Sequence, residues 1–421
     1  MRLECSGTSV RGEIVELRRT GLDVVVFDEN PVFWSDDDVV VEHTGRALAD
    51  VRHAAVVRSV SDEIFDGRRG RRIGLSLPTP APDVAGYPCP AQLPATASAM
   101  SPLFFQDWMH FILRTVTAGG ATLSTATEGV GLLPGLKLAF TVTVPFAGTY
   151  EVQAVVRSFH QEPDGAVAVC VSWIDPPRTF LAAVAEYLML AGTGLTPAQL
   201  RAGGLPLRNA ERVVTFGSAA FRQDGQEILN LRFRAHQHEG RLHGMTSADL
   251  ASAFDAHARH LVCRYEGRIV GYVRAIFVDG DPARSQYMRW GGHQVPPWLW
   301  EAGFVEAGAG AIDPEFQRAG LLLPLMQHVV RVAVQSGVGY VLGACSDELL
   351  DMYRAQGFEM LETRQVEPKP GWRFRSHLLQ LDIEQLIRHR FQSRSLEAMA
   401  SAALFAKSLD SAGSLTARRP R

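Results

Sequence analysis

The fold is decided by residues Val305 to Phe358, which read VEAGAGAIDPEFQRAGLLLPLMQHVVRVAVQSGVGYVLGACSDELLDMYRAQGF. Small and β-branched residues predict a strand over Phe304–Ile312, followed by a turn that contains proline. A long helix with an apolar period comes next, then a second strand over Gly339–Cys345 and a short helix. The loop Gln317–Leu322 therefore joins a strand to the N-terminus of a long helix.

The loop before the long helix suits a negatively charged ligand. Ala319 and Gly320 are small, so backbone N–H groups can approach a ligand closely. The positive end of the helix dipole lies directly behind them, and it favours phosphate groups. The sequence therefore predicts that a pyrophosphate binds at this helix N-terminus.

This stretch resembles motifs A and B of the GNAT acyltransferases. The pattern falls on Ile312, Pro314, Phe316, Gln317, Arg318 and Gly320, and Leu322 stands where a small residue is usual. The segment MYRAQGF at residues 352–358 resembles the end of the second motif. The resemblance implies an α+β domain with a mixed sheet, whose donor is an acyl-CoA or an acyl carrier protein thioester. It implies donor contacts at Ala311, Ile312, Gln317, Arg318, Ala319, Gly320, Leu321 and Leu322.

The sequence before this stretch indicates which branch of the GNAT family the chain resembles. LRFRAHQHEG at residues 231–240 and GYVRA at residues 271–275 resemble N-acyl amino acid synthases and acyl-homoserine lactone synthases. The resemblance implies substrate contacts at Arg232, Asp255 and Arg274, and a long acyl chain. Ala309 stands where the lactone synthases have an arginine, which favours an amino acid or a similar small amine as the acceptor.

Two residues are candidates for proton transfer. Attack of an amine on a thioester requires a base, because the amine arrives largely protonated at neutral pH. Glu306 is the candidate base, since apolar and small neighbours would bury it and raise its pKa, and Glu301 is the alternative. Tyr353 offers a phenol to the leaving thiolate, as the resemblance implies. Backbone N–H groups near residues 309–313 would polarise the thioester carbonyl.

The N-terminal half contains two β-rich blocks that look alike. The sequence AVVRS occurs in both, at residues 55–59 and 154–158, and each block also has a strand–turn–strand unit with glycine. Both resemble PilZ β-barrels, which implies an internal duplication. We therefore predict a multidomain chain of two PilZ-like β-barrels followed by the acyltransferase domain. The predicted bounds are 1–78 for the first barrel, 79–102 for a Pro- and Ala-rich linker, 103–195 for the second barrel with a C-terminal helix, 205–390 for the acyltransferase domain and 391–421 for a partly disordered tail.

The barrels lack parts of the pattern that PilZ domains use to bind cyclic di-GMP. The place of the ligand-binding turn is taken by Glu16, Arg18 and Gly21 in the first block and by Thr115, Thr117 and Gly120 in the second. Arg68 and Arg72 have the spacing of the arginine pair, but they read as a solvated hairpin tip. We expect scaffolding or docking barrels that do not bind cyclic di-GMP. The alternative function is a non-catalytic or regulated adaptor that responds to this nucleotide.

Composition and charge exclude further classes of protein. The net charge of −3 argues against a nucleic-acid partner. The five cysteines are scattered and the histidines lack the spacing of a ligand set, so we expect no metal and a reducing compartment. The longest apolar run, Phe180–Ala191, is too short to span a membrane. We expect a cytoplasmic enzyme whose partners are a small-molecule amine and an acyl carrier protein.

Overall fold

The computed structural model describes most of the chain, namely residues 1–5, 8–18, 21–27, 33–45, 48–76, 86–100, 108–126, 132–162, 165–207, 210–240, 242, 244–367 and 373–388. The predicted tail over 391–421 lies outside the described residues. The chain divides into two compact units, one with residues 1–195 and 199–207 and one with residues 196–198 and 208–421.

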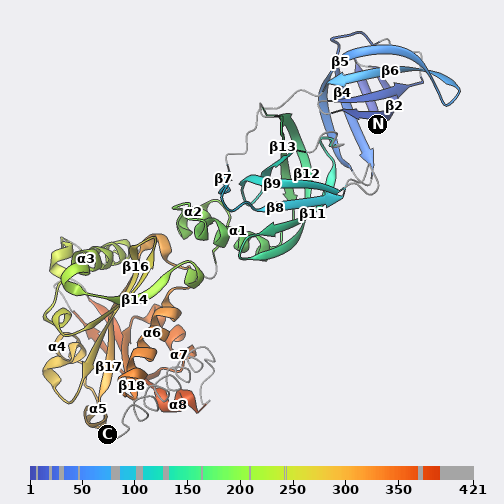
Figure 1. Cartoon of the computed structure of the whole chain (residues 1–421). Helices are drawn as coiled ribbons and strands as arrows, with labels where there is room; N and C mark the ends of the chain where they lie inside the picture. Colours follow the sequence, from blue (N-terminus) through green and yellow to red (C-terminus); the bar gives the residue numbers. More distant parts are fainter. Residues whose placement is uncertain are drawn as a thin grey trace, which may run out of the picture. The chain divides into compact units, whose positions relative to one another are not determined.

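The first β-rich block forms a closed antiparallel barrel, as predicted (Figure 1). Its strands are hydrogen-bonded in the order β1-β2-β3-β6-β5-β4, and β4 pairs with β1 to close the ring. Alternating apolar side chains such as Leu22 and Val24 fill its interior. The strands are β1 (Arg2–Cys5), β2 (Thr8–Arg18), β3 (Gly21–Val26), β4 (Asp38–Gly45), β5 (Leu48–Phe65) and β6 (Arg68–Ser76).

Arg72 lies within strand β6 and forms ion pairs with acidic residues of this barrel. Its Nε donates to the buried carboxylate of Asp23 at 2.7 Å, and the guanidinium group also pairs with Glu16 and Glu63. The expected solvated turn is therefore wrong for Arg72, because a buried carboxylate requires a charged or hydrogen-bonded partner. Arg68 lies over the ring of Phe27 at 4.3 Å. The expectation about cyclic di-GMP stays a prediction.

The second block also closes into a barrel. Its strands follow the order β10-β13-β12-β11-β8-β9, and β9 pairs with β10 to complete the ring. The helix α1 (Arg178–Leu190) follows the barrel as predicted, and Phe180 packs edge-on against Trp173 at 5.6 Å. The strands are β7 (Tyr87–Pro88), which pairs with β9, β8 (Thr96–Met100), β9 (Trp108–Val116), β10 (Gly120–Thr125), β11 (Lys137–Val144), β12 (Gly148–Gln161) and β13 (Val167–Ile174).

The second barrel begins inside the segment that we expected to be a linker. Strand β8 lies within 79–102 and pairs with both β9 and β11. Ala95, Ala97 and Ala99 point into the barrel and are buried. Alanine and serine have low β-propensity, so this alternation of small residues does not predict a strand. The linker prediction is therefore wrong for residues 96–100.

The C-terminal unit is built on one mixed sheet, as predicted. The strand order is β14-β15-β16-β17-β18-β20-β19, and only the β17–β18 pair is parallel. The strands are β14 (Thr215–Ala219), β15 (Arg259–Tyr265), β16 (Arg268–Val278), β17 (Phe304–Ile312), β18 (Tyr340–Cys345), β19 (Glu359–Val366) and β20 (Phe374–Asp382). The helices are α3 (Phe221–His238), α4 (Gln286–Gly291), α5 (Pro297–Ala302), α6 (Leu322–Gln335), α7 (Asp347–Ala355) and α8 (Ile383–Ile387), with single turns η1 (Ala210–Arg212), η2 (Ser247–Leu250), η3 (Ala253–Ala256), η4 (Pro282–Arg284) and η5 (Pro314–Phe316). The short helix α2 (Pro197–Ala202) contains the point where the chain passes from one unit to the other.

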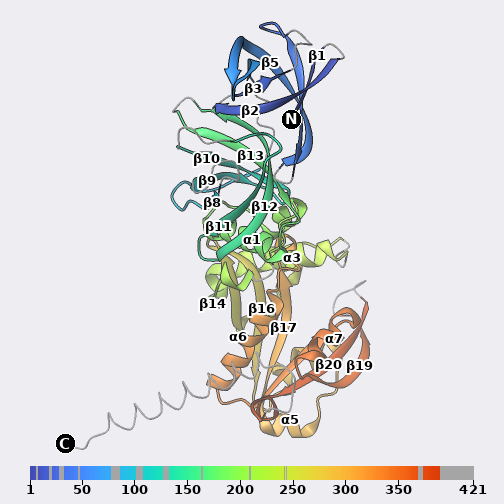
Figure 2. The same ribbon diagram turned by 90° about the vertical axis from the view of Figure 1, so that its right-hand side faces the viewer.

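Helices cover both faces of this sheet (Figures 1 and 2). On β16, Tyr272 packs against α3, whereas Gly271 faces Leu325 of α6. We call the two sides the α3 face and the α6 face. The α3 face also carries α4 and α5, and the α6 face also carries α7. Alternation along each strand therefore sends neighbouring residues to opposite sides of the sheet.

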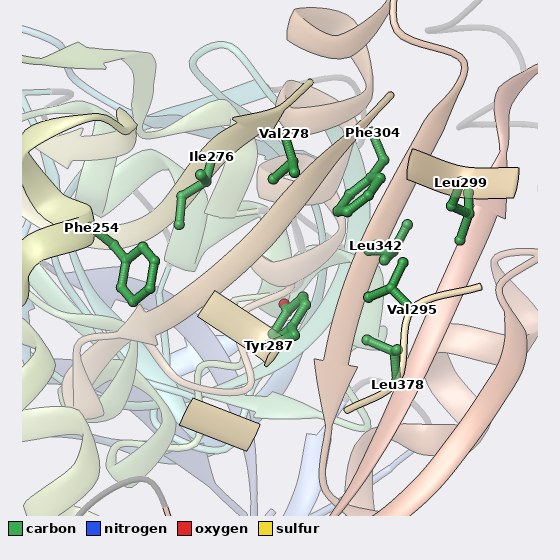
Figure 3. Packing of buried hydrophobic residues seen from close by; sticks show 9 residues of the cluster. All are labelled: Phe254, Ile276, Val278, Tyr287, Val295, Leu299, Phe304, Leu342 and Leu378. Atoms are coloured by element: carbon green, nitrogen blue, oxygen red, sulfur yellow. The ribbon is translucent and has the colours of Figure 1, made fainter. Parts of the chain in front are cut away.

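A cluster of buried hydrophobic residues fixes α4 and α5 on the α3 face (Figure 3). Tyr287 of α4 and Leu299 of α5 pack against Phe304, Leu342 and other residues of four strands. These two helices are short and would not be stable alone. Their position, and that of the loop between them, therefore depends on this packing.

None of the helices in the described part of the chain is long and apolar enough to cross a membrane.

Candidate active site

The main pocket of the C-terminal unit lies where β17 and β18 part. The two strands are paired from Phe304 and Tyr340 to Ala307 and Gly343, but both continue beyond that point. The pocket has a volume of about 420 Å³, and its walls include residues 307–312 of β17 and residues 344 and 345 of β18. The divergence of the strands opens the sheet, so the pocket has walls from both faces.

A β-bulge in β17 marks the centre of this pocket. Tyr272 of β16 pairs with Ala311, whereas Arg274 pairs with Gly308, so β17 carries one extra residue. Ala309 has φ of 53°, which is uncommon for a residue with a side chain. A bulge takes backbone groups out of the ladder and turns them towards another partner. The predicted site of carbonyl polarisation near residues 309–313 therefore contains an irregular strand.

The predicted donor-binding residues divide into those whose side chains line the pocket and those whose side chains do not. The side chains of Ala311, Ile312, Gln317 and Leu322 line the pocket. Ala319 and Leu321 are buried away from it, and the Ala319 carbonyl accepts a hydrogen bond from Ala210 at 3.2 Å. Arg318 and Gly320 are exposed, with φ of 60° and 81°. Residues 318–321 could therefore contact a donor through the backbone, at the N-terminus of α6.

Tyr353 lies in the wall of the pocket on the α6 face. Its ring packs edge-on against Phe358 at 5.1 Å, and its hydroxyl group is 3.9 Å from the sulfur of Met326. Burial raises the pKa of the phenol above its ordinary value, and the neighbouring thiol of Cys345 raises it further. The hydroxyl group therefore holds its proton at neutral pH and can donate it.

A buried ionic network lies on the α3 face. The guanidinium group of Arg274 is fully buried and donates to Asp255, to Ser252 Oγ at 2.8 Å and to Gln286 Oε1 at 2.6 Å. Arg232 of α3 reaches the same Asp255 oxygen at 3.7 Å. The three residues predicted to bind substrate are therefore brought together by the fold.

Two members of this network have nitrogen atoms that donate no hydrogen bond within the described part of the chain, although Arg232 lies within ion-pair distance of Asp255. They are Nε and Nη1 of Arg232 and Nε2 of Gln286. Both side chains are at least nine-tenths buried and line the pocket. Burial and the charge of Arg274 lower the pKa of Arg232. The site therefore contains buried donors and positive charge that an anion would satisfy.

Glu306 lies beneath the pocket wall and is fully buried. Its carboxyl group accepts hydrogen bonds from Ser285 Oγ and from the backbone N–H of Gln286, the latter at 2.8 Å. Burial raises the pKa of Glu306 to about 7, although these hydrogen bonds and Arg274 oppose the shift. The predicted burial and direction of the shift agree with the structure. The predicted role as a base stays untested, since direct contact with an amine would require one of these bonds to be replaced.

Gln286 and Ser285 were not among the residues predicted from sequence. They lie at the start of α4, in a region without a recognisable motif. A Cβ atom at Gly308 would lie 2.0 Å from Gln286 Nε2, so the glycine makes room for this side chain. No group of three or more His, Cys, Asp or Glu residues suited to a metal occurs among the described residues.

The mixed sheet, the parted parallel strands and the loop before α6 define an acyltransferase of the GNAT class. Residues 227–382 match the model of one family in particular, described as N-acyl amino acid synthase FeeM. This match confirms the resemblance inferred from the sequence of the C-terminal unit. The protein is an acyltransferase. The expectation that its barrels do not bind cyclic di-GMP stays a prediction.

Solved structures with similar folds cover either the C-terminal unit or the barrels. FeeM from uncultured soil microbes is 10% identical, with a TM-score of 0.35 over 41% of this chain and 92% of that one. YncA, a putative acetyltransferase from Salmonella typhimurium solved with its cofactor acetyl-CoA, is 18% identical, with a TM-score of 0.30 over 40% and 94%. MrkH of K. pneumonia in its apo state is 10% identical, with a TM-score of 0.23 over 46% and 87%. No protein with a curated description matches the sequence.

Replacing Glu306 by glutamine should change how stability depends on pH. The pKa of about 7 in the folded protein lies above the ordinary glutamate value of about 4.5. The stabilisation from the protonated carboxyl group is therefore complete below about pH 4.5 and is lost as the pH rises through about 7. Relative to Glu306→Gln, the parent should lose on the order of 3 kcal/mol across this window. Urea unfolding of both proteins at about pH 5 and about pH 8 measures the change; an equal difference at both values would contradict it.

Proposed function

We propose that the protein transfers a long acyl chain from a phosphopantetheine thioester to the amino group of a free amino acid. The observation that carries this proposal is the pair of buried donors, on Arg232 and Gln286, in a pocket whose other end meets the loop before α6. An acceptor without a carboxylate would leave these donors unsatisfied. The substrate therefore has to bring an anion as well as an amine.

The charge of the buried network supports a carboxylate as this anion. Arg232 and Arg274 share a single oxygen of Asp255. Glu306 has a pKa of about 7 and is therefore only partly ionised near neutral pH. Positive charge thus exceeds negative charge in a region of low solvent access, which is costly without an anion. An amino acid carboxylate held by Arg232 and the Gln286 amide would balance it.

The donor end of the pocket fits a thioester. The backbone of residues 318–321 and the N-terminus of α6 would hold pyrophosphate or carrier-protein phosphate. Apolar side chains of α6 and α7, including Leu325, Met326 and Leu349, line the adjoining wall and suit an acyl chain. The resemblance to N-acyl amino acid synthases favours acyl carrier protein over coenzyme A as the carrier.

Tyr353 is the proposed acid that protonates the departing thiolate. Its hydroxyl group holds its proton and lies on the α6 face with the donor.

We place the protein in the cytoplasm. Its five cysteines are all free, which fits a reducing compartment.

Gly320→Val should abolish turnover. Gly320 has φ of 81°, which a β-branched residue adopts only under strain, and the added side chain would block approach to the backbone. Bacteria that overproduce the parent should accumulate an N-acyl amino acid that mass spectrometry detects, and bacteria with Gly320→Val should not. Gly217→Val is the control, because a Cβ atom there meets nothing within 4 Å. Unchanged product from Gly320→Val would show that the donor binds elsewhere.

Arg232→Gln should weaken selection for the carboxylate. Hydrogen bonds to charged groups contribute about 1.5–3 kcal/mol, so kcat/KM for amino acids should fall about 10- to 150-fold. The parent's preference for an amino acid over the corresponding amine without a carboxylate should shrink by the same factor. Turnover of that amine is the internal control for folding. A preference that survives in the variant would place the carboxylate at another site.

Tyr353→Phe should lower kcat while the thioester still binds. The change removes only the hydroxyl group, and general acid catalysis typically contributes about 10²- to 10⁴-fold. Tyr340→Phe is the matched control, because Tyr340 lies on β18 outside the pocket wall. Steady-state kinetics with one acyl thioester compare the two variants. Equal kcat values would remove Tyr353 from the proposed proton transfer.

A further inference from the structure

The pocket wall on the α3 face contains a hydrogen-bonded serine, histidine and glutamate. His293, in the loop between α4 and α5, has its Nε2 3.2 Å from Ser376 Oγ and its Nδ1 3.2 Å from Glu362 Oε2. His293 and Ser376 are almost fully buried, and both line the pocket. A hydroxyl group, an imidazole and a carboxylate in this order form an arrangement in which a neutral histidine can accept the proton of the hydroxyl group.

The surrounding structure holds this histidine in one orientation. Gly292 ends α4 in the left-handed conformation, with φ of 59°, and the backbone N–H of His293 bonds to the carbonyl of Tyr287 at 3.1 Å. The backbone N–H of Gln294 donates to Glu362 at 2.9 Å. The hydrophobic cluster of Figure 3 includes both Tyr287 and Val295, which flank the loop. The loop is therefore fixed at both ends.

The electrostatic surroundings leave His293 neutral and Glu362 charged. Burial lowers the pKa of His293, as do Arg364 and His377, whereas Glu362 opposes the shift. Burial opposes ionisation of Glu362, but hydrogen bonds from Gln294, Arg364 and His293 lower its pKa overall. A carboxylate only accepts hydrogen bonds, so the Nδ1 proton of His293 points to Glu362. The lone pair of Nε2 then faces the Ser376 hydroxyl group.

Other titratable groups of the described pocket wall are less suited to receive a proton from an acceptor. Glu239 and Glu348 are exposed, and His236 is half-buried and lies 3.8 Å from Glu239. Arg232 and Arg274 are cations, and Tyr353 lies on the α6 face with the donor. Glu306 is not in the wall, and its oxygens are hydrogen-bonded to α4. His293 lies close in the chain to Gln286, so the proposed carboxylate contact and this base come from the same short segment.

We propose that His293 is the base that deprotonates the acceptor, with Ser376 as the relay and Glu362 as the positioning residue. This inference rests on the proposed acylation of an amino acid. A proton passes from the ammonium group to Ser376 Oγ while the Ser376 proton passes to His293 Nε2. The resulting imidazolium is paired with Glu362, and the neutral amine attacks the thioester carbonyl carbon. The C–N bond forms, the C–S bond breaks, Tyr353 gives its proton to the departing thiolate, and the second amine proton returns to the Tyr353 phenolate.

The test compares variants of the full chain with one acyl thioester and one amino acid. His293→Gln should lower kcat/KM by about 10²- to 10⁴-fold at neutral pH. It should also remove the bend that His293 protonation produces at low pH, leaving a rate that rises about tenfold per pH unit as free amine accumulates. Glu362→Gln should move that bend to lower pH, because the imidazolium loses its partner.

His377→Gln is the matched control. His377 is also buried and bonds to a carboxylate and a hydroxyl group, with Nε2 2.7 Å from Asp347 and Nδ1 2.8 Å from Thr363, but it does not line the pocket. It should keep kcat/KM near the parent value and keep the bend in the pH profile, which moves only slightly to higher pH because His377 no longer lowers the pKa of His293. An active parent whose pH profile is unchanged in His293→Gln would overturn the inference and leave the proposed function standing. A parent that makes no amide from any amino acid would overturn both.

Discussion

A buried guanidinium group sets the arrangement of the acceptor side of this enzyme. Arg274 is fully enclosed, and an enclosed cation is destabilising by several kcal/mol unless hydrogen bonds and an opposite charge surround it. Asp255, Ser252 and Gln286 meet that requirement. These partners come from η3, the residue before it and α4, so the need to satisfy one charge fixes several short segments that have little stability of their own.

The same constraint explains why two side chains of the pocket wall keep hydrogen-bond donors without a partner among the described residues. Gln286 gives its carbonyl oxygen to Arg274, so its amide nitrogen lies next to Gly308 without a hydrogen-bond partner among the described residues. Asp255 gives its closest contact to Arg274 and reaches Arg232 only at 3.7 Å. Satisfaction of Arg274 therefore leaves donors on its two neighbours, which the carboxylate of the proposed amino acid substrate would satisfy.

The sequence predicted the elements that carry a local signal. Strand β17 was predicted to the residue, because glycine, alanine and valine over 304–312 are followed by a proline turn, and α1 has a clear apolar period. Strand β8 was missed because its alternation is carried by alanine. Gln286, His293 and Ser376 could not be predicted, since they meet only through long-range packing, and His293 is one of thirteen histidines without a motif around it.

The two faces of the sheet separate the chemistry of donor and acceptor. Helices α6 and α7 carry the apolar wall and Tyr353 on one side, whereas α3, α4 and the loop after α4 carry Arg232, Gln286 and His293 on the other. In the described part of the chain, the pocket joins the two faces where β17 and β18 part, beyond Ala307 and Gly343. A thioester that enters from the α6 face and an amino acid held on the α3 face must therefore meet at the bulge of β17. In the proposed roles, the acid Tyr353 and the base His293 lie on opposite sides of that point, so neither has to exchange a proton with the other. The amine can therefore be deprotonated while the thioester is still intact.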